Sequence, residues 1–174
     1  MKNTGFVEMQ GFRQPLLWLA LIGLEGLLLY ANYSQLVLNQ PIGDHPVSNG
    51  TLLGFLFLFT FLLFLLWSVK LMTKIDETGI YYRFSIFQRK FKFQSWSEVK
   101  FCSVRTFSPL REYGGWGIRW GGKSGMAYTV SGNQGLQLVL KDQTQLLIGT
   151  KESDQLKNYL ESIHQWKEAG QNPS

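Results

Sequence analysis

The chain has 174 residues, of which 45% are hydrophobic and 17% are charged, whereas about 25% are charged in an average soluble domain. Its net charge is +5, and its single cysteine and two histidines exclude an intramolecular disulfide framework and a multi-cysteine metal site. We therefore expect a basic protein that is not an enzyme and has no catalytic, cofactor-binding or metal-binding residues.

Two long apolar runs dominate the N-terminal part of the sequence, at residues 15–38 and 52–69. Each is close to the ~20 residues that a helix needs to cross a bilayer. The runs predict helices at about 15–37 and 51–71, which together form a transmembrane hairpin over residues 15–71. The second run contains no charged residue, so a soluble buried helix is a poor alternative for it.

The segment before the first run, residues 1–14, is predicted to be a polar leader. A cleaved signal peptide is the competing interpretation, because Lys2 and Arg13 precede the apolar stretch. The length of the leader, the glutamate at position 25 and the lack of a clear A-x-A-like cleavage site favour a retained membrane helix.

The basic residues predict the orientation of the hairpin. Residues 31–50 contain no lysine or arginine, whereas basic residues lie at both ends of the hairpin: Lys2, Arg13, Lys70, Lys74 and Arg83. The positive-inside rule then places both termini in the cytoplasm. Trp67 with the lysines that follow it is typical of an anchor at the membrane interface.

Glu25 is the one ionisable residue inside the predicted spans. Such a residue is a functional candidate by default, and in an antiparallel hairpin its depth matches that of Thr60, so a hydrogen bond between the two is feasible. The alternative is a purely structural role, with a protonated carboxyl packed against the neighbouring helix or a second copy of the protein. One carboxyl and one hydroxyl are too few polar groups for ion transport.

From position 70 onward the hydrophobic period changes to two, which predicts a strand-rich domain over residues 72–168 and a flexible tail at 169–174. Residues 89–94 alternate charge with aromatic side chains. We expect the cations of this segment to point outward, with Phe91 and Phe93 in the core. Cys102 is expected to be a small buried hydrophobic residue.

Residues 152–166 predict a C-terminal amphipathic helix, because Leu156, Tyr159, Leu160 and Ile163 share one face. About seven strands precede it, at the spacing typical of an antiparallel sandwich or partly open barrel. The predicted fold class is α+β: a two-helix transmembrane hairpin followed by an antiparallel β-barrel of about seven strands, capped by this helix.

This order of elements resembles the pleckstrin-homology (PH) fold, and the chain is similar to small bacterial two-pass membrane proteins with a cytoplasmic PH-like domain. The resemblance rests on IDETGI (75–80), WSEV (96–99), REYGGWGIR (111–119), VSGNQGL (130–136) and LIGT (147–150). It implies a multi-pass protein of the bacterial inner membrane, and it supplies no catalytic residues.

The stretch 111–123 is the most distinctive of the sequence, since it combines glycines with aromatic and basic residues. Its glycine spacing misses the G-x-G-x-x-G pattern by one residue and no strand–helix unit surrounds it, which argues against a nucleotide-binding loop. Together with the basic run before it, it gives the candidate binding surface: Arg89, Lys90, Lys92, Arg111, Tyr113, Trp116, Arg119 and Lys123.

Positive charge is concentrated near the predicted membrane segments. Residues 70–123 contain eleven basic and four acidic residues, whereas residues 124–174 contain four basic and five acidic ones. Basic residues beside anionic lipid gain about 1 kcal/mol each, so lipid headgroups are a candidate ligand; a solvated strand face is the alternative. Nucleic acid is not expected, because it needs a wider basic field with base-stacking aromatics.

Two functions follow from this sequence. The first is a membrane-anchored interaction module that binds a protein partner, and anionic lipid as an additional ligand, at the cytoplasmic face. The second is a structural or accessory subunit of an inner-membrane complex, which assembles through the hairpin with another protein or with a second copy of itself.

Overall fold

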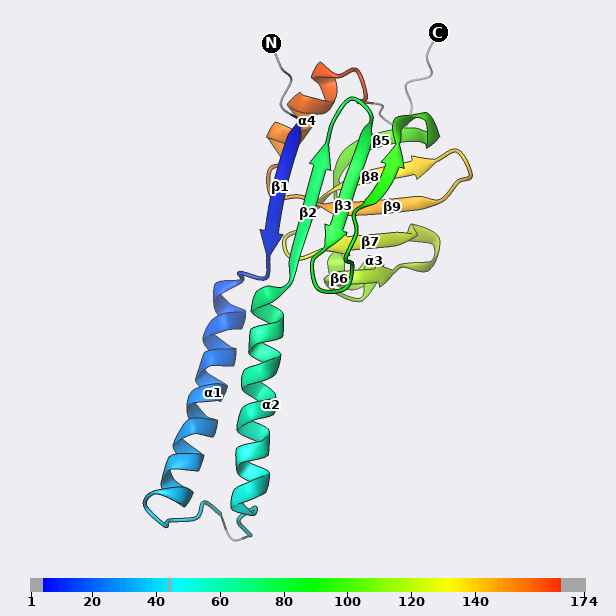
Figure 1. Ribbon diagram of the computed structural model, residues 1–174. Helices are drawn as coiled ribbons and strands as arrows, with labels where there is room; N and C mark the ends of the chain where they lie inside the picture. The colour runs from blue at the N-terminus through cyan, green and yellow to red at the C-terminus, as the bar shows by residue number, and fades with distance from the viewer. Residues whose placement is uncertain (1–4, 44, 167–174) are drawn as a thin grey trace. The chain divides into compact units, whose positions relative to one another are not determined.

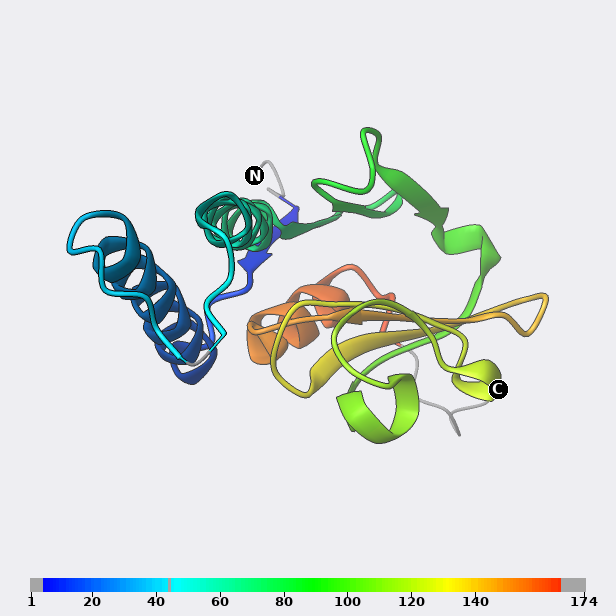
Figure 2. The same cartoon turned by 90° about the horizontal axis from the view of Figure 1, so that it is seen from below.

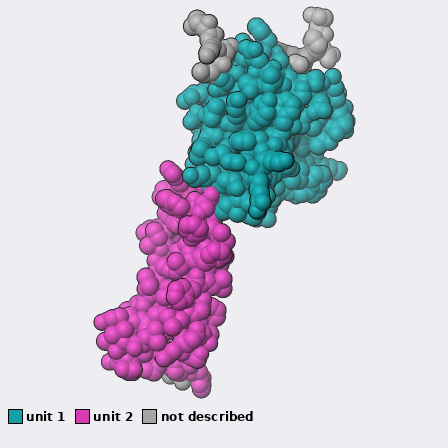
Figure 3. All heavy atoms as spheres, viewed as in Figure 1, with its two compact units in different colours: residues 1–11, 69–174 teal, residues 12–68 magenta. Residues whose placement is uncertain are grey.

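The computed structural model describes residues 5–43 and 45–166. These residues divide into two compact units (Figure 3). The hairpin unit consists of residues 12–68, and the sheet unit consists of the described residues before and after it.

The hairpin unit contains α1 (Pro15–Leu36) and α2 (Asn49–Ser68), which pack against each other (Figure 1). Proline suits the first position of α1, because its fixed φ is helical and no intrahelical N–H is lost there. Both helices are long and apolar enough to cross a membrane, and most of their side chains are exposed. Exposed apolar surface of this extent is costly in water, and it suggests a membrane protein.

Aromatic side chains join the two helices at the end of the hairpin where α1 begins and α2 ends. The rings of Trp18 and Trp67 meet edge to face at 5.4 Å, and the Arg13 guanidinium lies 5.9 Å from the Trp67 ring. Trp18 Nε1 also donates a hydrogen bond of 2.6 Å to the carbonyl of Phe12. Tryptophan beside a cation is the composition that favours a membrane–water interface.

The described part of the sheet unit contains nine strands in two sheets (Figures 1 and 2). The first sheet has the order β1 (Phe6–Gly11), β2 (Lys70–Ile75), β3 (Gly79–Phe84) and β4 (Lys92–Ser95). The second has the order β5 (Val99–Thr106), β8 (Gln134–Leu140), β9 (Gln145–Gly149), β7 (Met126–Thr129) and β6 (Gly117–Trp120). Figure 2 shows them as separate layers, which the chain joins by passing from β4 through the short helix η1 (Trp96–Glu98) into β5.

This architecture confirms an α+β chain with a helical hairpin and a C-terminal helix, but the described strands form two sheets and no closed barrel, whereas a β-barrel of about seven strands was predicted. Among the described strands no ladder joins the edges of one sheet to those of the other. The sheets are also not wholly antiparallel, because β7 pairs with β9 in parallel. Both edges of β8 are occupied, by β5 and β9, so β7 pairs with the remaining edge of β9.

The core lies between the two layers. Leu71, Ile75, Ile80 and Phe84 of the first sheet are almost fully buried, and Tyr82 meets Tyr128 of the second sheet with ring centroids 4.8 Å apart. Cys102 is fully buried in β5, as the sequence predicted.

Strand β1 lies within residues 1–14, for which the sequence predicts a polar leader and no strand. It pairs antiparallel with β2, from Phe6 opposite Ile75 to Gly11 opposite Lys70. Its inward face carries Phe6, Glu8 and Gln10, all buried. Buried and exposed side chains therefore alternate along β1, but two of the buried ones are polar. A search for alternating apolar residues does not detect such a strand.

Residues 149–151 form hydrogen bonds with the buried polar side chains of β1. Glu8 accepts a hydrogen bond of 2.7 Å from Thr150 Oγ1 and one of 2.8 Å from the backbone N–H of Lys151. Gln10 Nε2 donates to the carbonyl of Gly149 at 2.6 Å. Residues before the hairpin are thus an integral part of the sheet unit.

The outer face of the second sheet is covered by the segment that contains α3 (Pro109–Tyr113). Phe107 and Tyr113 pack there against Ala127 and Leu147 in a buried cluster. Strand β9 is therefore buried on both faces, which explains its nearly continuous apolar sequence.

The expectation that Phe91 and Phe93 lie in the core is wrong. Their side chains are 45% and 50% exposed, respectively. Strand β4 begins only at Lys92 and forms an edge of its sheet, and Phe93 stacks on the outer face against Tyr81 with ring centroids 4.6 Å apart.

Helix α4 (Ser153–Ser162) buries Leu156 and Leu160 and packs against β5. Its Tyr159 ring lies 6.5 Å from that of Phe6 in β1. Two predicted boundaries lie outside the described residues, namely the end of the domain at 168 and the tail at 169–174.

Candidate interaction surface

The loop between β3 and β4 presents the first part of the predicted surface. Arg89 and Lys90 are both exposed in it, as are Ile86 and Phe87, the latter to 69%. The loop starts at Ser85, whose backbone N–H donates to the carbonyl of Lys70 at 2.8 Å and whose Oγ accepts from the Lys70 N–H at 2.9 Å.

Lys92 has a more definite position than its neighbours. Its Nζ donates a hydrogen bond of 2.7 Å to the hydroxyl of Tyr128 and lies 5.2 Å from the centre of the same ring. Lys92 therefore links the edge of the first sheet to β7 of the second, and its charge remains partly exposed.

The second part of the surface comes from α3, β6 and the short helix η2 (Gly122–Ser124). Arg111, Arg119 and Lys123 are exposed, and Trp116 is half-buried, with its Nε1 donating to the carbonyl of Gly132 at 2.8 Å. Tyr113 is buried; its hydroxyl donates to the Ser124 carbonyl at 3.0 Å, which ties α3 to η2, and burial raises its pKa. It belongs to the core and is not available to a ligand.

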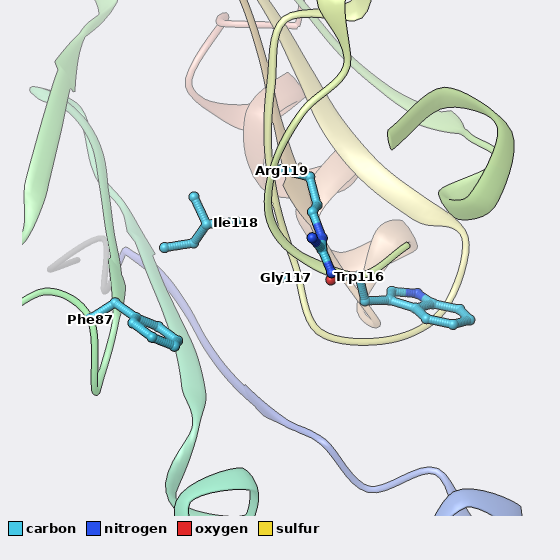
Figure 4. A pocket seen from close by; sticks show the side chains of 5 residues that line it. All are labelled: Phe87, Trp116, Gly117, Ile118 and Arg119. Atoms are coloured by element: carbon cyan, nitrogen blue, oxygen red, sulfur yellow. The ribbon is translucent and has the colours of Figure 1, made fainter. Parts of the chain in front are cut away.

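A pocket of about 390 Å³ brings the two parts together (Figure 4). Phe87 lines it from the β3–β4 loop, and residues 116–119 line it from the stretch that enters β6. Figure 4 shows the Trp116 ring turned away from Phe87. Arg119 folds back so that its Nε donates to the carbonyl of Trp116 at 3.2 Å, which leaves the rest of the guanidinium directed along the pocket wall.

The cations of this surface are not neutralised by carboxylates in the described part of the chain. The ion pairs there involve other cations, namely Lys74 with Asp76, Arg105 with Glu112 and Lys157 with Glu161. Uncompensated cations that lie on one surface create a positive potential that attracts anions.

The Arg105–Glu112 pair is structural. The two side chains meet at 2.7 Å, and Glu112 also accepts a hydrogen bond of 2.7 Å from the backbone N–H of Ser108. The hydrogen bond from Arg105 lowers the pKa of Glu112, with the Ser108 N–H adding to the effect. The pair fixes α3, and with it Arg111, against β5.

The hairpin unit contains the predicted polar pair. Thr60 Oγ1 donates a hydrogen bond to Glu25 Oε1 at 2.5 Å, and the threonine hydroxyl also lies 2.9 Å from the carbonyl of Leu56. Glu25 Oε2 has no hydrogen-bond partner within the described residues. The hydrogen bond expected between Glu25 and Thr60 is therefore present.

No three histidine, cysteine, aspartate or glutamate side chains of the described residues are grouped so that they could hold a metal ion. Comparisons with protein-family models, with curated proteins and with solved structures give no match to this chain.

The structure gives a role to two residues that the sequence did not indicate, Phe87 and Glu8. Phe87 faces the pocket, and the exposed pair Ile86–Phe87 beside two cations was an available signal, because apolar residues are not expected at the tip of a solvated loop. Glu8 was missed because a buried carboxylate near the N-terminus has no local sequence signature.

Proposed function

We propose that this protein is a membrane-anchored interaction module, in which the hairpin holds a PH-like sheet domain against the cytoplasmic face of the bacterial inner membrane. The domain binds a protein partner there, with anionic lipid as an additional ligand. The basic surface built from the β3–β4 loop, α3, β6 and η2 provides the binding site.

The pairing of β1 with β2 carries this proposal. One strand precedes the hairpin and the other follows it, and Gly11 lies opposite Lys70 in the ladder. Both ends of the hairpin must therefore be on the same side of a membrane that it enters. Cleavage of a signal peptide after α1 would remove β1 and its hydrogen bonds to residues 149–151, which supports retention of both helices.

The cytoplasmic orientation rests on the distribution of basic residues. Arg13 and Lys70 lie next to the two ends of the hairpin, and the connection between its helices contains no lysine or arginine. A loop without positive charge is the segment that is translocated most readily.

Single-cysteine labelling tests the orientation. In a Cys102→Ala background, a cysteine at Glu77 of the sheet unit should react with a membrane-impermeant maleimide only after the cells are opened. A cysteine at Gln40, between the helices, should react in intact cells. Reaction of the Glu77 position in intact cells would place the sheet unit outside and exclude a cytoplasmic partner.

Partner binding is tested by photo-crosslinking in native membranes. A photoreactive residue at Arg111 or Lys123 should give a discrete cross-linked product, identified by mass spectrometry, and the same residue at Asp142, in the exposed turn between β8 and β9, should not. Equal products at all three positions would contradict a defined partner surface.

The alternative is an accessory subunit assembled through the hairpin, and the unpartnered oxygen of Glu25 favours it. In the apolar layer of a bilayer an unsatisfied carboxyl oxygen is costly, and a second helix that donates to it would remove the cost. Under this alternative, Glu25→Ala should dissociate a complex seen by native electrophoresis, whereas Arg111→Gln with Lys123→Gln should not.

A further inference from the structure

We propose that the β3–β4 loop is a second membrane contact of this protein: Phe87 and Phe91 enter the interfacial layer of the bilayer, and Arg89, Lys90 and Arg119 bind anionic lipid headgroups. This inference rests on the anchoring part of the proposed function, but it requires neither a protein partner nor a particular orientation. The ligand is the surface of the same bilayer in which the hairpin resides.

The position of the loop in its sheet is the first argument. The loop leaves β3 at Ser85, which forms two hydrogen bonds with Lys70. Lys70 is the first residue of β2, and α2 ends at Ser68. The β3–β4 loop therefore starts at the end of β3 that lies beside the first residue of β2, close in sequence to the end of α2. The β2–β3 turn lies at the opposite end of these two strands.

The chemistry of the loop is the second argument. Phe87 is 69% exposed and Phe91 is 45% exposed, which is unusual for large aromatic side chains in a loop tip. They flank the exposed cations at 89 and 90, and the Arg83 guanidinium lies 4.8 Å from the Phe91 ring. Aromatic rings beside cations are the combination that peripheral membrane segments use, because the rings favour the interface and the cations attract anionic headgroups.

The pocket supplies the third argument. It lies where Phe87 approaches β6, and its wall carries the partly unpaired guanidinium of Arg119. A planar guanidinium with free N–H groups binds phosphate oxygens well, and the rest of the lining is largely apolar or backbone. A phospholipid headgroup has this combination of a charged phosphate and an adjoining apolar part.

The covalent link between the sheet unit and the hairpin favours a lipid surface over an acidic protein as the ligand. A ligand on the bilayer to which the chain is anchored is present at a high effective concentration, so a few weak contacts suffice for binding. An acidic protein would pair with the cations, but it would not account for the large exposed aromatic rings of the loop.

The experiment uses the full chain in nanodiscs, with an environment-sensitive fluorophore on a cysteine at position 87 in a Cys102→Ala background. Quenching by lipids that carry a nitroxide on the acyl chain reports contact with the bilayer. In nanodiscs of phosphatidylcholine with phosphatidylglycerol, we expect strong quenching at position 87. A matched label at Glu77, in the β2–β3 turn, should be quenched little.

Charge variants test the role of the cations. Arg89→Gln, Lys90→Gln and Arg119→Gln together should lower the ratio of bilayer-contacting to free loop by about a hundredfold, which is roughly fivefold per cation. The control variant Lys100→Gln, Lys141→Gln, Lys151→Gln removes three exposed charges elsewhere and should leave the quenching unchanged. High salt should weaken the contact, because the Debye length falls from about 10 Å at 0.1 M to about 3 Å at 1 M.

Three outcomes would overturn the inference: no quenching at position 87, equal quenching at positions 87 and 77, or equal quenching in nanodiscs of phosphatidylcholine alone. If the loop instead gave a cross-link to an acidic protein and no quenching, it would be a protein-docking site. The cysteine labelling at positions 77 and 40 in cells tests the proposed function independently, so failure of the inference and failure of the proposed function can be distinguished.

Discussion

Thr150 Oγ1 donates a hydrogen bond of 2.7 Å to Glu8 Oε2, which joins two residues that are 142 positions apart in the chain. Together with the bond from Gln10 to the Gly149 carbonyl, it fastens the strand before the hairpin to the end of β9. The strand that precedes the hairpin is therefore held in the sheet unit by residues that follow the hairpin.

The first prediction concerns the buried polar groups of β1. Gln10→Ala should lower the free energy of unfolding of the sheet unit by about 1–3 kcal/mol, because it removes a donor from a buried carbonyl. Val7→Ala, on the exposed face of the same strand, is the control and should change it by less than about 0.5 kcal/mol. Urea unfolding of the full chain in micelles can be followed by the reaction of Cys102 with a thiol reagent, since this buried thiol reacts only when the sheets open. Equal effects of the two variants would show that the inward bonds of β1 do not stabilise the unit.

The second prediction is a pH dependence. Burial raises the pKa of Glu8 above 4.5, although the hydrogen bonds from Thr150 and the Lys151 N–H oppose this. At pH values between 4.5 and the raised pKa, the folded state binds more protons than the unfolded state. The stability that Glu8 contributes is therefore present below pH 4.5 and is lost as the pH rises through the folded-state pKa. The stability of Glu8→Gln relative to the natural chain should therefore increase from pH 4.5 toward neutrality. Asp76 and Glu112 titrate below this window, because hydrogen bonds and ion pairing outweigh desolvation and lower their pKa values. A constant difference between the two proteins over this range would contradict the prediction.

The third prediction is that, without the hairpin, the sheet unit is more stable when β1 is kept than when it is removed. Gly11 and Lys70 lie opposite each other in an antiparallel ladder, so replacing residues 12–69 by Asn-Gly should join the two strands through a tight turn. This shortened chain should be soluble and should unfold cooperatively, whereas a chain that begins at position 70 should be less stable and more prone to aggregate, because the edge of β2 is then uncovered. Circular dichroism and gel filtration of the two chains make the comparison. Equal stability of both chains would mean that β1 is dispensable.

The fourth prediction uses two glycines that both have a positive φ and differ in their surroundings. Gly125 has φ +73°, and a Cβ there would collide with the backbone carbonyl of Gln145; Gly122 has φ +58° and open space around it. Gly125→Ala should therefore destabilise the sheet unit more than Gly122→Ala, which has only the conformational cost of about 1 kcal/mol. The Cys102 assay measures both, and the reverse order would contradict the assigned geometry.

Much of the fold follows from local patterns. The two apolar runs and the amphipathic face of α4 are each expressed within a few residues, so the sequence predicted them. The position of β1 depends on contacts with residues 149–151, and no short-range pattern can indicate a strand whose inward side chains are Glu8 and Gln10. The parallel pairing of β7 with β9 likewise depends on which strand edge remains unoccupied.

The sequence indicated which residue types form the candidate surface, but only part of how these residues are arranged in space. Trp116 and Arg119 lie together in one pocket, and Lys92 reaches the hydroxyl of Tyr128. The sequence could not show that Tyr113 is buried, because the strand residues that it packs against, Ala127 of β7 and Leu147 of β9, lie far from it in the sequence.

The pairing of β1 with β2 also affects how the protein is made. The first strand leaves the ribosome before the hairpin and has no partner until β2 has been synthesised. If only one of the two helices crossed the bilayer, β1 and β2 would be on opposite sides and the first sheet could not form, leaving Leu71 and Phe84 exposed to proteolysis. The paired strands are thus incompatible with insertion of only one of the two helices, and a chain inserted in that way would have an incomplete first sheet.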